Sequence, residues 1–350
     1  MIRGVIYILS VVGLVVGASF HVPIYTSISM DIYYDSDVFN FSESDFARID
    51  AADSLLTFNE FKSSIVMRPR IGIEYTPFIS KKPLEIKFSV SPKYALSVPI
   101  KNTISYNASL RYKIKQYTYF KIWHSYIPKI YIRNFRDKDD LIHSGPFVSM
   151  NDECWFGRER IGISYTEKLM RRSLLTRSLT LSSMYFDEPF DEFNLRIVGV
   201  GLGIKYLEHK DHSLNLGAHI SYADNYTRMT NRRSVSTYDR GYVEILFRYS
   251  FEQKQAFNNE SLRLGVSGHI VSRKYISTFE EDPIHYNRYQ TDNLLMAWCK
   301  LKIGKSVSIK PSISYRVKNI SSPYTWVEKL KAFDKFNIGF KVSKAMVFDV

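Results

Sequence analysis

The residue types and spacing that best suit chemistry occur at His219 and Ser221. In an extended strand, residues i and i+2 point to the same face, so the imidazole could contact the hydroxyl and activate it as a nucleophile. No carboxylate is clearly positioned to orient the ring, and the nearest candidate amide, Asn225, is not adjacent to the serine. Ser267 and His269 repeat the spacing in reverse order, which shows how easily such pairs arise. We therefore predict no catalytic residue here.

A second candidate is an acidic stretch near the N-terminus, which has one basic residue, Arg48, among six acids. Clustered carboxylates can bind Ca²⁺, but the regular spacing and the glycine of a calcium loop are missing. The sequence also lacks CxxC and HExxH motifs, so we predict no metal and no cofactor. We expect a solvated loop that carries Asp35, Asp37, Glu43, Asp45, Asp50 and Asp53.

The elements that would position these residues are β-strands, and the segment 194–226 shows their pattern most clearly. Apolar residues at Val198, Val200 and Leu202 alternate with Gly199 and Gly201, which is the period of two expected for a strand with two different faces. The same alternation recurs almost to the last residue. It predicts strands at 24–34, 58–76, 84–97, 103–115, 118–133, 153–166, 174–186, 194–206, 214–226, 240–250, 261–276, 289–302, 307–318 and 333–350.

The connections between these fourteen segments alternate in length. Those after odd-numbered strands, such as 35–57 and 134–152, are often long, and those after even-numbered strands, such as 116–117 and 303–306, are shorter. One long-loop end and one short-turn end are typical of an outer-membrane barrel. The sequence predicts an all-β fold: a transmembrane, antiparallel, up-and-down β-barrel of about 14 strands with both termini in the periplasm. A soluble β-sandwich is the alternative, but it would leave sheet edges to protect.

The first residues predict export from the cytoplasm. Arg3 precedes an apolar segment, 5–16, and small residues end at Ala18, which is the pattern of a cleaved signal peptide; an N-terminal membrane anchor is the alternative. We predict a signal peptide at 1–18 and a single barrel domain at 19–350. Cys154 and Cys299 are the only cysteines, and the sequence leaves open whether they pair.

On these features, the whole mature chain resembles Gram-negative outer-membrane β-barrel proteins. The C-terminal strand fits in part, because apolar residues keep one parity through Phe348 although the chain ends on Val350 rather than an aromatic residue. The class includes lipid hydrolases with a His-x-Ser signature that Asn usually follows. Here Tyr222 follows Ser221, and parity places His219 in the lumen rather than against lipid.

The net charge of +13 lies largely on the strands. No nucleic-acid-binding motif is present and the charges are not in tails, so we predict no nucleic-acid partner. Inward acids on the same strands are few: Asp31, Glu74, Glu85 and Glu244. The predicted basic pore-lining residues are Arg68, Arg70, Arg111, Lys113, Arg158, Arg160, Arg196, Arg248, Arg263, Lys310 and Arg316.

Three functions remain open from the sequence. The first is a channel or transporter for small anionic or polar solutes. The second is a closed barrel with a structural, adhesion or export-assisting role. The third, a lipid hydrolase, is the least favoured. The resemblance implies outer-membrane localisation, contact with outer-membrane lipids and lipopolysaccharide, and handling by the barrel-assembly machinery.

Overall fold

The protein folds as one closed sheet of antiparallel strands, seen here in a computed structural model. The structure describes residues 23–42, 45, 63–136, 151–188, 190, 193–209, 212–225, 241–257, 260–277, 280, 283–304 and 306–348. The strands are β1 (Ile24–Asp35), β2 (Ser64–Tyr75), β3 (Phe78–Ile79), β4 (Lys82–Ala95), β5 (Thr103–Lys115), β6 (Thr118–Arg136), β7 (Asn151–Met170), β8 (Ser173–Phe186), β9 (Leu195–His209), β10 (His212–Asn225), β11 (Tyr242–Phe257), β12 (Glu260–Tyr275), β13 (Tyr289–Ile303), β14 (Val307–Ser321) and β15 (Phe333–Phe348).

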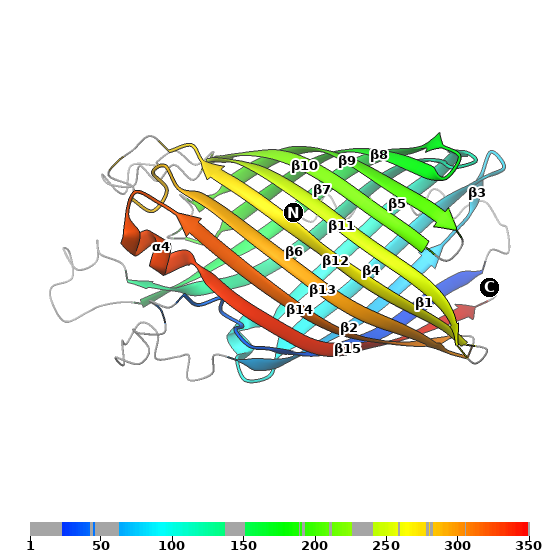
Figure 1. Cartoon of the computed structure of the whole chain (residues 1–350), viewed down its shortest axis with the longest axis horizontal. Coiled ribbons are helices and arrows are strands. Elements are labelled where there is room, and N and C mark those ends of the chain that lie inside the picture. The colour runs from blue at the N-terminus through cyan, green and yellow to red at the C-terminus, as the bar shows by residue number, and fades with distance from the viewer. Residues whose placement is uncertain are drawn as a thin grey trace.

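The sheet closes on itself. The long strands pair in chain order, and β1 pairs with both β2 and β15. β2 pairs directly with β4, and the two-residue strand β3 in the connection between them pairs with the start of β4. Figure 1 shows the long strands tilted around a common axis. Closure pairs every strand edge, which a bilayer demands because hydrocarbon offers no hydrogen-bond partner to the backbone. The predicted fold class and its fourteen long strands are confirmed, whereas the side on which the termini lie stays a prediction.

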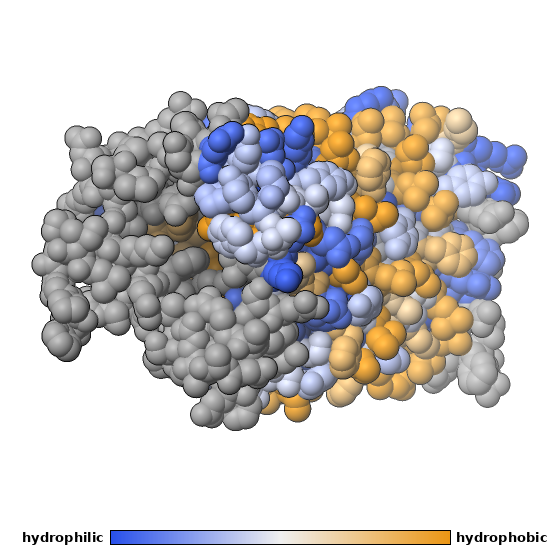
Figure 2. Space-filling model, turned by 60° about the vertical axis from the view of Figure 1, so that its left-hand side comes forward, coloured by the Kyte–Doolittle hydropathy of each residue, from blue (hydrophilic) through white to orange (hydrophobic). Residues whose placement is uncertain are grey.

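The outer wall carries the apolar side chains. Ile71, Val200 and Leu202 are 56%, 56% and 58% exposed, and they belong to rows of cross-strand neighbours that run around the barrel. Figure 2 shows apolar residues gathered over the strands, with hydrophilic residues towards the ends. So much exposed apolar surface is stable against lipid but not against water.

Some predicted strand ends differ from the structure. β6 and β7 are longer than predicted, and their pairing shifts register between Ile127 and Ile130 and again between Tyr131 and Asn134. A bulge adds a residue and reverses the face of those that follow, so simple alternation fails there. β9 runs on to His209 and β11 to Phe257, because their pairing with β10 and β12 continues to His212 and Glu260. The predicted strand 58–76 begins at Ser64, and residues 58–62 lie outside the described part.

Short helices occur in the connections at the long-loop end. The 3₁₀-helix η1 (Pro99–Lys101) links β4 to β5, and α4 (Thr325–Lys331) follows β14. In the ranges that the structure describes, no helix has the length and apolar character needed to cross a membrane.

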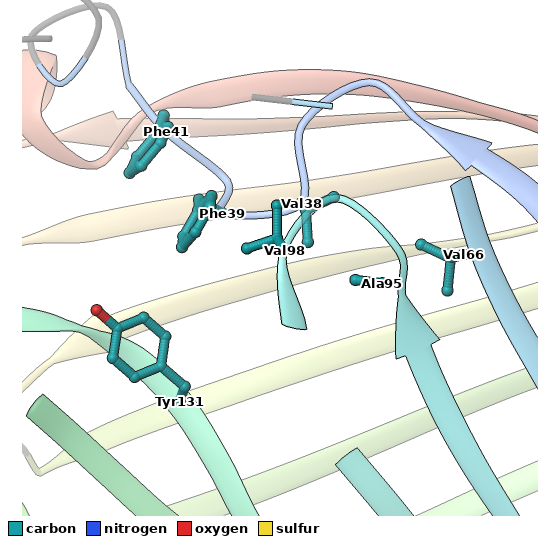
Figure 3. Close-up of a cluster of buried hydrophobic side chains, with 7 residues drawn as sticks. All are labelled: Val38, Phe39, Phe41, Val66, Ala95, Val98 and Tyr131. Carbon is teal, nitrogen blue, oxygen red and sulfur yellow. The ribbon is translucent and has the colours of Figure 1, made fainter. Parts of the chain in front are cut away.

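The start of the β1–β2 connection folds into the barrel mouth. Val38, Phe39 and Phe41 are buried against side chains of β2, β4 and β6, among them Val66 and Tyr131 (Figure 3). The prediction of a solvated acidic loop is wrong for its described residues. Apolar contacts pull the segment inward, and the acids that accompany it, Asp35, Asp37 and Asp45, are 3%, 2% and 0% exposed. Glu43, Asp50 and Asp53 lie outside the described residues.

Candidate functional site

The inner wall of the barrel is the candidate functional site, and cross-strand register decides which residues line it. Paired residues on neighbouring strands share a face. Val66, packed inside the mouth, marks the inner face of β2, and Arg68 and Arg70 follow it at i+2 and i+4. Extending this parity through the pairings places ten of the eleven predicted basic residues on the inner wall. They are Arg68, Arg70, Arg111, Lys113, Arg158, Arg160, Arg248, Arg263, Lys310 and Arg316.

Arg196 lies on the outer wall instead, which corrects its predicted place in the lumen. It shares the parity of Val198 and Val200, is exposed, and pairs across strands with Ser183 and Asp224. It occupies the second position of β9, near the long-loop end. Alternation alone assigns a residue two positions before Val198 to the same face.

Acidic residues neutralise part of the basic inner wall. Guanidinium groups of Arg316 and Arg273 lie 2.5 Å from carboxylates of Asp292 and Glu244. Arg111 lies 3.7 Å from Glu85. Lys87 contacts both Glu74 and Glu85 at 3.0 Å, and Arg263 lies 2.7 Å from Glu252. These pairs were not predicted from sequence. Lys87 and Glu85 are two positions apart on β4, and each of the other pairs requires the register of two strands.

Other inward cations have no carboxylate partner among the described residues. Arg160 lies 5.7 Å from the ring centre of Trp123, and Arg248 stands between Gly217 and His269 on the neighbouring strands. Arg160 and Arg248 repel each other although three strands, β8, β9 and β10, lie between them around the wall. The inward residues of β8, β9 and β10, which lie between them, are largely Gly, Ser and Thr. The two arginine side chains therefore extend further into the lumen than the residues around them. An anion in the lumen would be attracted most strongly to such unpaired cations.

His219 and Ser221 both face inward, but they do not form a nucleophile and base. The imidazole Nε2 lies 3.0 Å from Oγ1 of Thr180, two strands away, and the ring covers Gly199 and Gly201. Ser221 is 5% exposed, and its cross-strand neighbours are Gly199 and Glu244. The space left by the glycines is therefore filled by His219, and the hydroxyl that it contacts belongs to Thr180.

At two places on the inner wall, a tryptophan ring packs against a glycine of the neighbouring strand, a feature that was not predicted from the sequence. A Cβ on Gly162 would stand 2.4 Å from the ring of Trp123, and one on Gly265 would stand 2.2 Å from the ring of Trp298. Each pair lies directly across two neighbouring strands. Glycine at an inward position is the sequence signal, but the partner ring is known only once register is known.

The in-folded segment, residues 36–42, and the preceding Asp35 are held against the last strand, β15, by a hydrogen bond and an ion pair at the barrel mouth. Lys335 Nζ lies 3.3 and 3.2 Å from the two carboxylate oxygens of Asp35, and it donates to the backbone oxygen of Asp37 at 3.2 Å. Burial raises the pKa of Asp37 to about 6, although Lys335 lowers it in part. The mouth thus holds a carboxyl group that titrates near neutral pH.

Metal and disulfide chemistry were also considered. In the described part of the chain, no three His, Cys, Asp or Glu side chains gather in a way that could hold a metal ion. Cys154 lies on β7 in a buried cluster with Phe186 and Phe190, whereas Cys299 lies on the outer wall of β13. The two do not form a disulfide with each other.

No protein-family model matches the chain, and no characterised protein matches it in sequence. Among solved structures, a bacterial polysaccharide outer membrane secretin is similar over 94% of this chain and 100% of its own, at 7% identity and a TM-score of 0.45. The outer membrane channel DcaP of Acinetobacter baumannii matches 93% of this chain and 97% of its own, at 8% identity and a TM-score of 0.46. OmpT of Vibrio cholerae matches 94% and 99%, at 8% identity and a TM-score of 0.45.

These likenesses are too distant to transfer a function, so the assignment rests on the barrel itself. Its sheet has no free edge, its outer wall is apolar, and its inner wall is polar and basic. That combination suits a bilayer and no aqueous compartment. The chain is an outer-membrane β-barrel protein.

Proposed function

We propose that the barrel is a channel or transporter whose cationic lumen passes small anionic or polar solutes. The observation that carries this proposal is the pair Arg160 and Arg248, which project from a wall of small residues with no carboxylate partner among the described residues. Basic groups around a confined passage raise the local concentration of anions, and rings of such groups are one way in which pores select them.

A closed barrel is the second candidate, and the in-folded segment favours it. Phe39 and Phe41 stack with ring centres 4.8 Å apart inside the mouth, and Lys101 lies 4.5 Å from the ring centre of Phe39. These contacts narrow the passage at the long-loop end. The lipid hydrolase is not proposed, because His219 contacts Thr180 and faces away from lipid.

The test is the reversal potential of refolded protein in a planar bilayer under a salt gradient. We expect an anion-selective wild type whose selectivity weakens at high salt, because screening shortens the reach of the wall charges. Arg160→Glu with Arg248→Glu should move the reversal potential towards cations. Arg316 and Arg111 are poorer choices, since substitution of Arg316 would leave Asp292 without its partner and substitution of Arg111 would leave Glu85 with Lys87 alone.

The matched control is Arg196→Glu with Lys274→Glu. Both basic residues lie on the outer wall, and the pair changes the formal charge by the same amount. The control should leave the reversal potential near its wild-type value. A cation-selective wild type, or equal behaviour of the two double variants, would contradict the proposal. Absence of any current would favour the closed barrel.

A further inference from the structure

One row of cross-strand neighbours on the inner wall is basic on almost every strand that it crosses. Arg263 pairs with Lys300, and the register on either side places Lys300 opposite Lys310. Lys310 pairs with Lys341, which is followed across β1 by Arg68. The register of β2 with β4 then places Lys93 opposite Arg68. We call these six residues the basic row; Asp31, on β1, interrupts it between Lys341 and Arg68.

The basic row climbs along the barrel axis. Arg263, Lys300 and Lys310 lie near the short-turn ends of their strands, Arg68 lies in mid-strand, and Lys93 lies two residues from the long-loop end of β4. Strands tilt in a closed barrel, so a row perpendicular to them spirals from one end towards the other. The row crosses seven strands, from β12 to β4. At a strand spacing of about 4.8 Å, the six steps between them span about 29 Å measured along the row. The row therefore offers one positive charge on each strand that it crosses except β1, where Asp31 stands.

Two carboxylates compensate the six cations of the basic row in part: Glu252 lies 2.7 Å from Arg263, and Asp31 attracts Lys310, Lys341 and Arg68. Among the described residues, Lys300, Lys310 and Lys341 have no carboxylate at ion-pair distance, and the three ammonium groups repel one another. Arg68 donates to the hydroxyl of Ser91, at 3.3 Å, its one hydrogen bond within the described part of the chain. Like charges in adjacent positions destabilise a sheet. An anionic ligand that lay along the row would relieve this repulsion at several sites together.

The two neighbouring rows supply groups of a different kind. On the long-loop side stands Trp298, whose ring lies on Gly265 and whose ring centre is 4.1 Å from Lys310 Nζ. On the short-turn side, three serines occupy successive strands: Ser308, Ser343 and Ser29. The basic row thus runs between an aromatic plane and a line of hydroxyl groups.

We propose that the basic row binds an extended acidic oligosaccharide, with one acidic sugar for about each strand crossed; this rests on the proposed function and names its substrate class. Carboxylates would meet the Lys and Arg side chains. Sugar hydroxyls would meet the serines, and the apolar face of a ring would lie on Trp298. Each separate contact is weak in water, and several on one chain add through effective concentration.

The flanking rows favour an oligosaccharide over a linear polyphosphate or an acidic peptide. A polyphosphate has neither an apolar face for Trp298 nor hydroxyl groups for the serines. An acidic peptide offers carboxylates, but it carries its own amide groups, which the serine hydroxyls alone cannot all satisfy. Polyphosphate and oligo-aspartate are therefore the discriminating competitors.

The experiment uses hexagalacturonate as the probe, with block of the single-channel current as the readout. We expect half-block at a concentration at least about tenfold below that of galacturonate monomer, counted per uronate, because linked groups bind together. Neutral maltohexaose should block weakly. Lys300→Gln with Lys310→Gln and Lys341→Gln should raise the half-blocking concentration about tenfold or more, and Trp298→Ala should raise it several-fold.

The matched control removes the same number of charges elsewhere in the lumen: Lys121→Gln with Arg160→Gln and Arg248→Gln. Both triple variants should lose anion selectivity for small ions, and only the row variant should lose high affinity for hexagalacturonate. Single Lys310→Gln and Lys341→Gln variants, checked for heat-modifiable mobility, guard against a triple variant that fails to fold.

The outcomes separate this inference from the channel proposal. Anion-selective current with equal block by monomer and hexamer would overturn the basic row and leave the channel. Equal block by polyphosphate or oligo-aspartate, insensitive to Trp298→Ala, would overturn the oligosaccharide. If no current flows, titration of Trp fluorescence in detergent decides: saturable binding of hexagalacturonate that the row variant loses supports the row, and no binding to the wild type overturns it.

Discussion

Gly199 and His219 share one space on the inner wall. A Cβ on Gly199 would stand 2.2 Å from Cε1 of His219, and the ring reaches past it to Thr180. A side chain at position 199 must therefore move the imidazole or the strand. The inward side chains of β8, β9 and β10 are smaller than those of the neighbouring strands, but at Gly199 the ring of His219 occupies the space.

Gly199→Ala is expected to destabilise the barrel by about 1–3 kcal/mol, because it overpacks a tight contact. Urea unfolding in lipid vesicles measures the loss. In the double variant with His219→Ala the clash is absent, so most of the loss should be recovered. Gly203→Ala is the control, since its nearest neighbours stand at 3.7 and 3.8 Å. Equal losses at the two glycines would contradict this packing.

His219 and Ser221 are expected to have no catalytic role. His219→Ala should cost only about 1 kcal/mol through the lost contact with Thr180, and Ser221→Ala should cost little. Purified wild type should turn over neither phospholipid nor lipid A in mixed micelles. Measurable hydrolysis that both substitutions abolish would restore the hydrolase.

The stability of the in-folded segment in the barrel mouth is expected to depend on pH through Asp37. Its folded pKa of about 6 lies above the value of 3.8 for a free carboxyl, so folding favours the protonated form. Stability of the segment should therefore be full below about pH 4 and fall as pH rises through 6, by at most about 3 kcal/mol. The pH window reflects both Lys335, which opposes the shift, and Asp35, which adds to it.

Hydrogen exchange of residues 36–42, corrected for intrinsic rates, measures this effect. Protection should be higher at pH 5 than at pH 7.5. Asp37→Asn should hold the segment at a level that no longer changes between the two pH values. Protection that rises with pH in the wild type would contradict the prediction that the segment is stabilised by protonated Asp37.

The long-loop end is expected to face the cell exterior. A protease site inserted in the connection 137–150, which lies outside the described residues, should be cut in intact cells. A site in the turn 171–172 should be cut only after the outer membrane is permeabilised, because short turns of such barrels face the periplasm. The opposite pattern would invert the topology and place both termini outside.

The sequence by itself determined the class of fold. Alternation with period two located fourteen long strands, because the two faces of a membrane strand meet such different surroundings that composition records them. The same rule, applied strictly, places Arg196 with Val198 on the outer wall. Alternation became unreadable in β6, where bulges beyond Ile127 reverse the faces.

Only the tertiary structure decided which inward charges are compensated. Arg316 and Arg248 look alike in sequence, yet one lies 2.5 Å from Asp292 and the other has no carboxylate partner among the described residues. Lys335 meets Asp35 across 300 positions of chain, and Phe39 enters the mouth through contacts with distant strands. Such contacts depend on cross-strand register and on closure, and a slip of one residue would exchange every pair, so no local pattern can encode them.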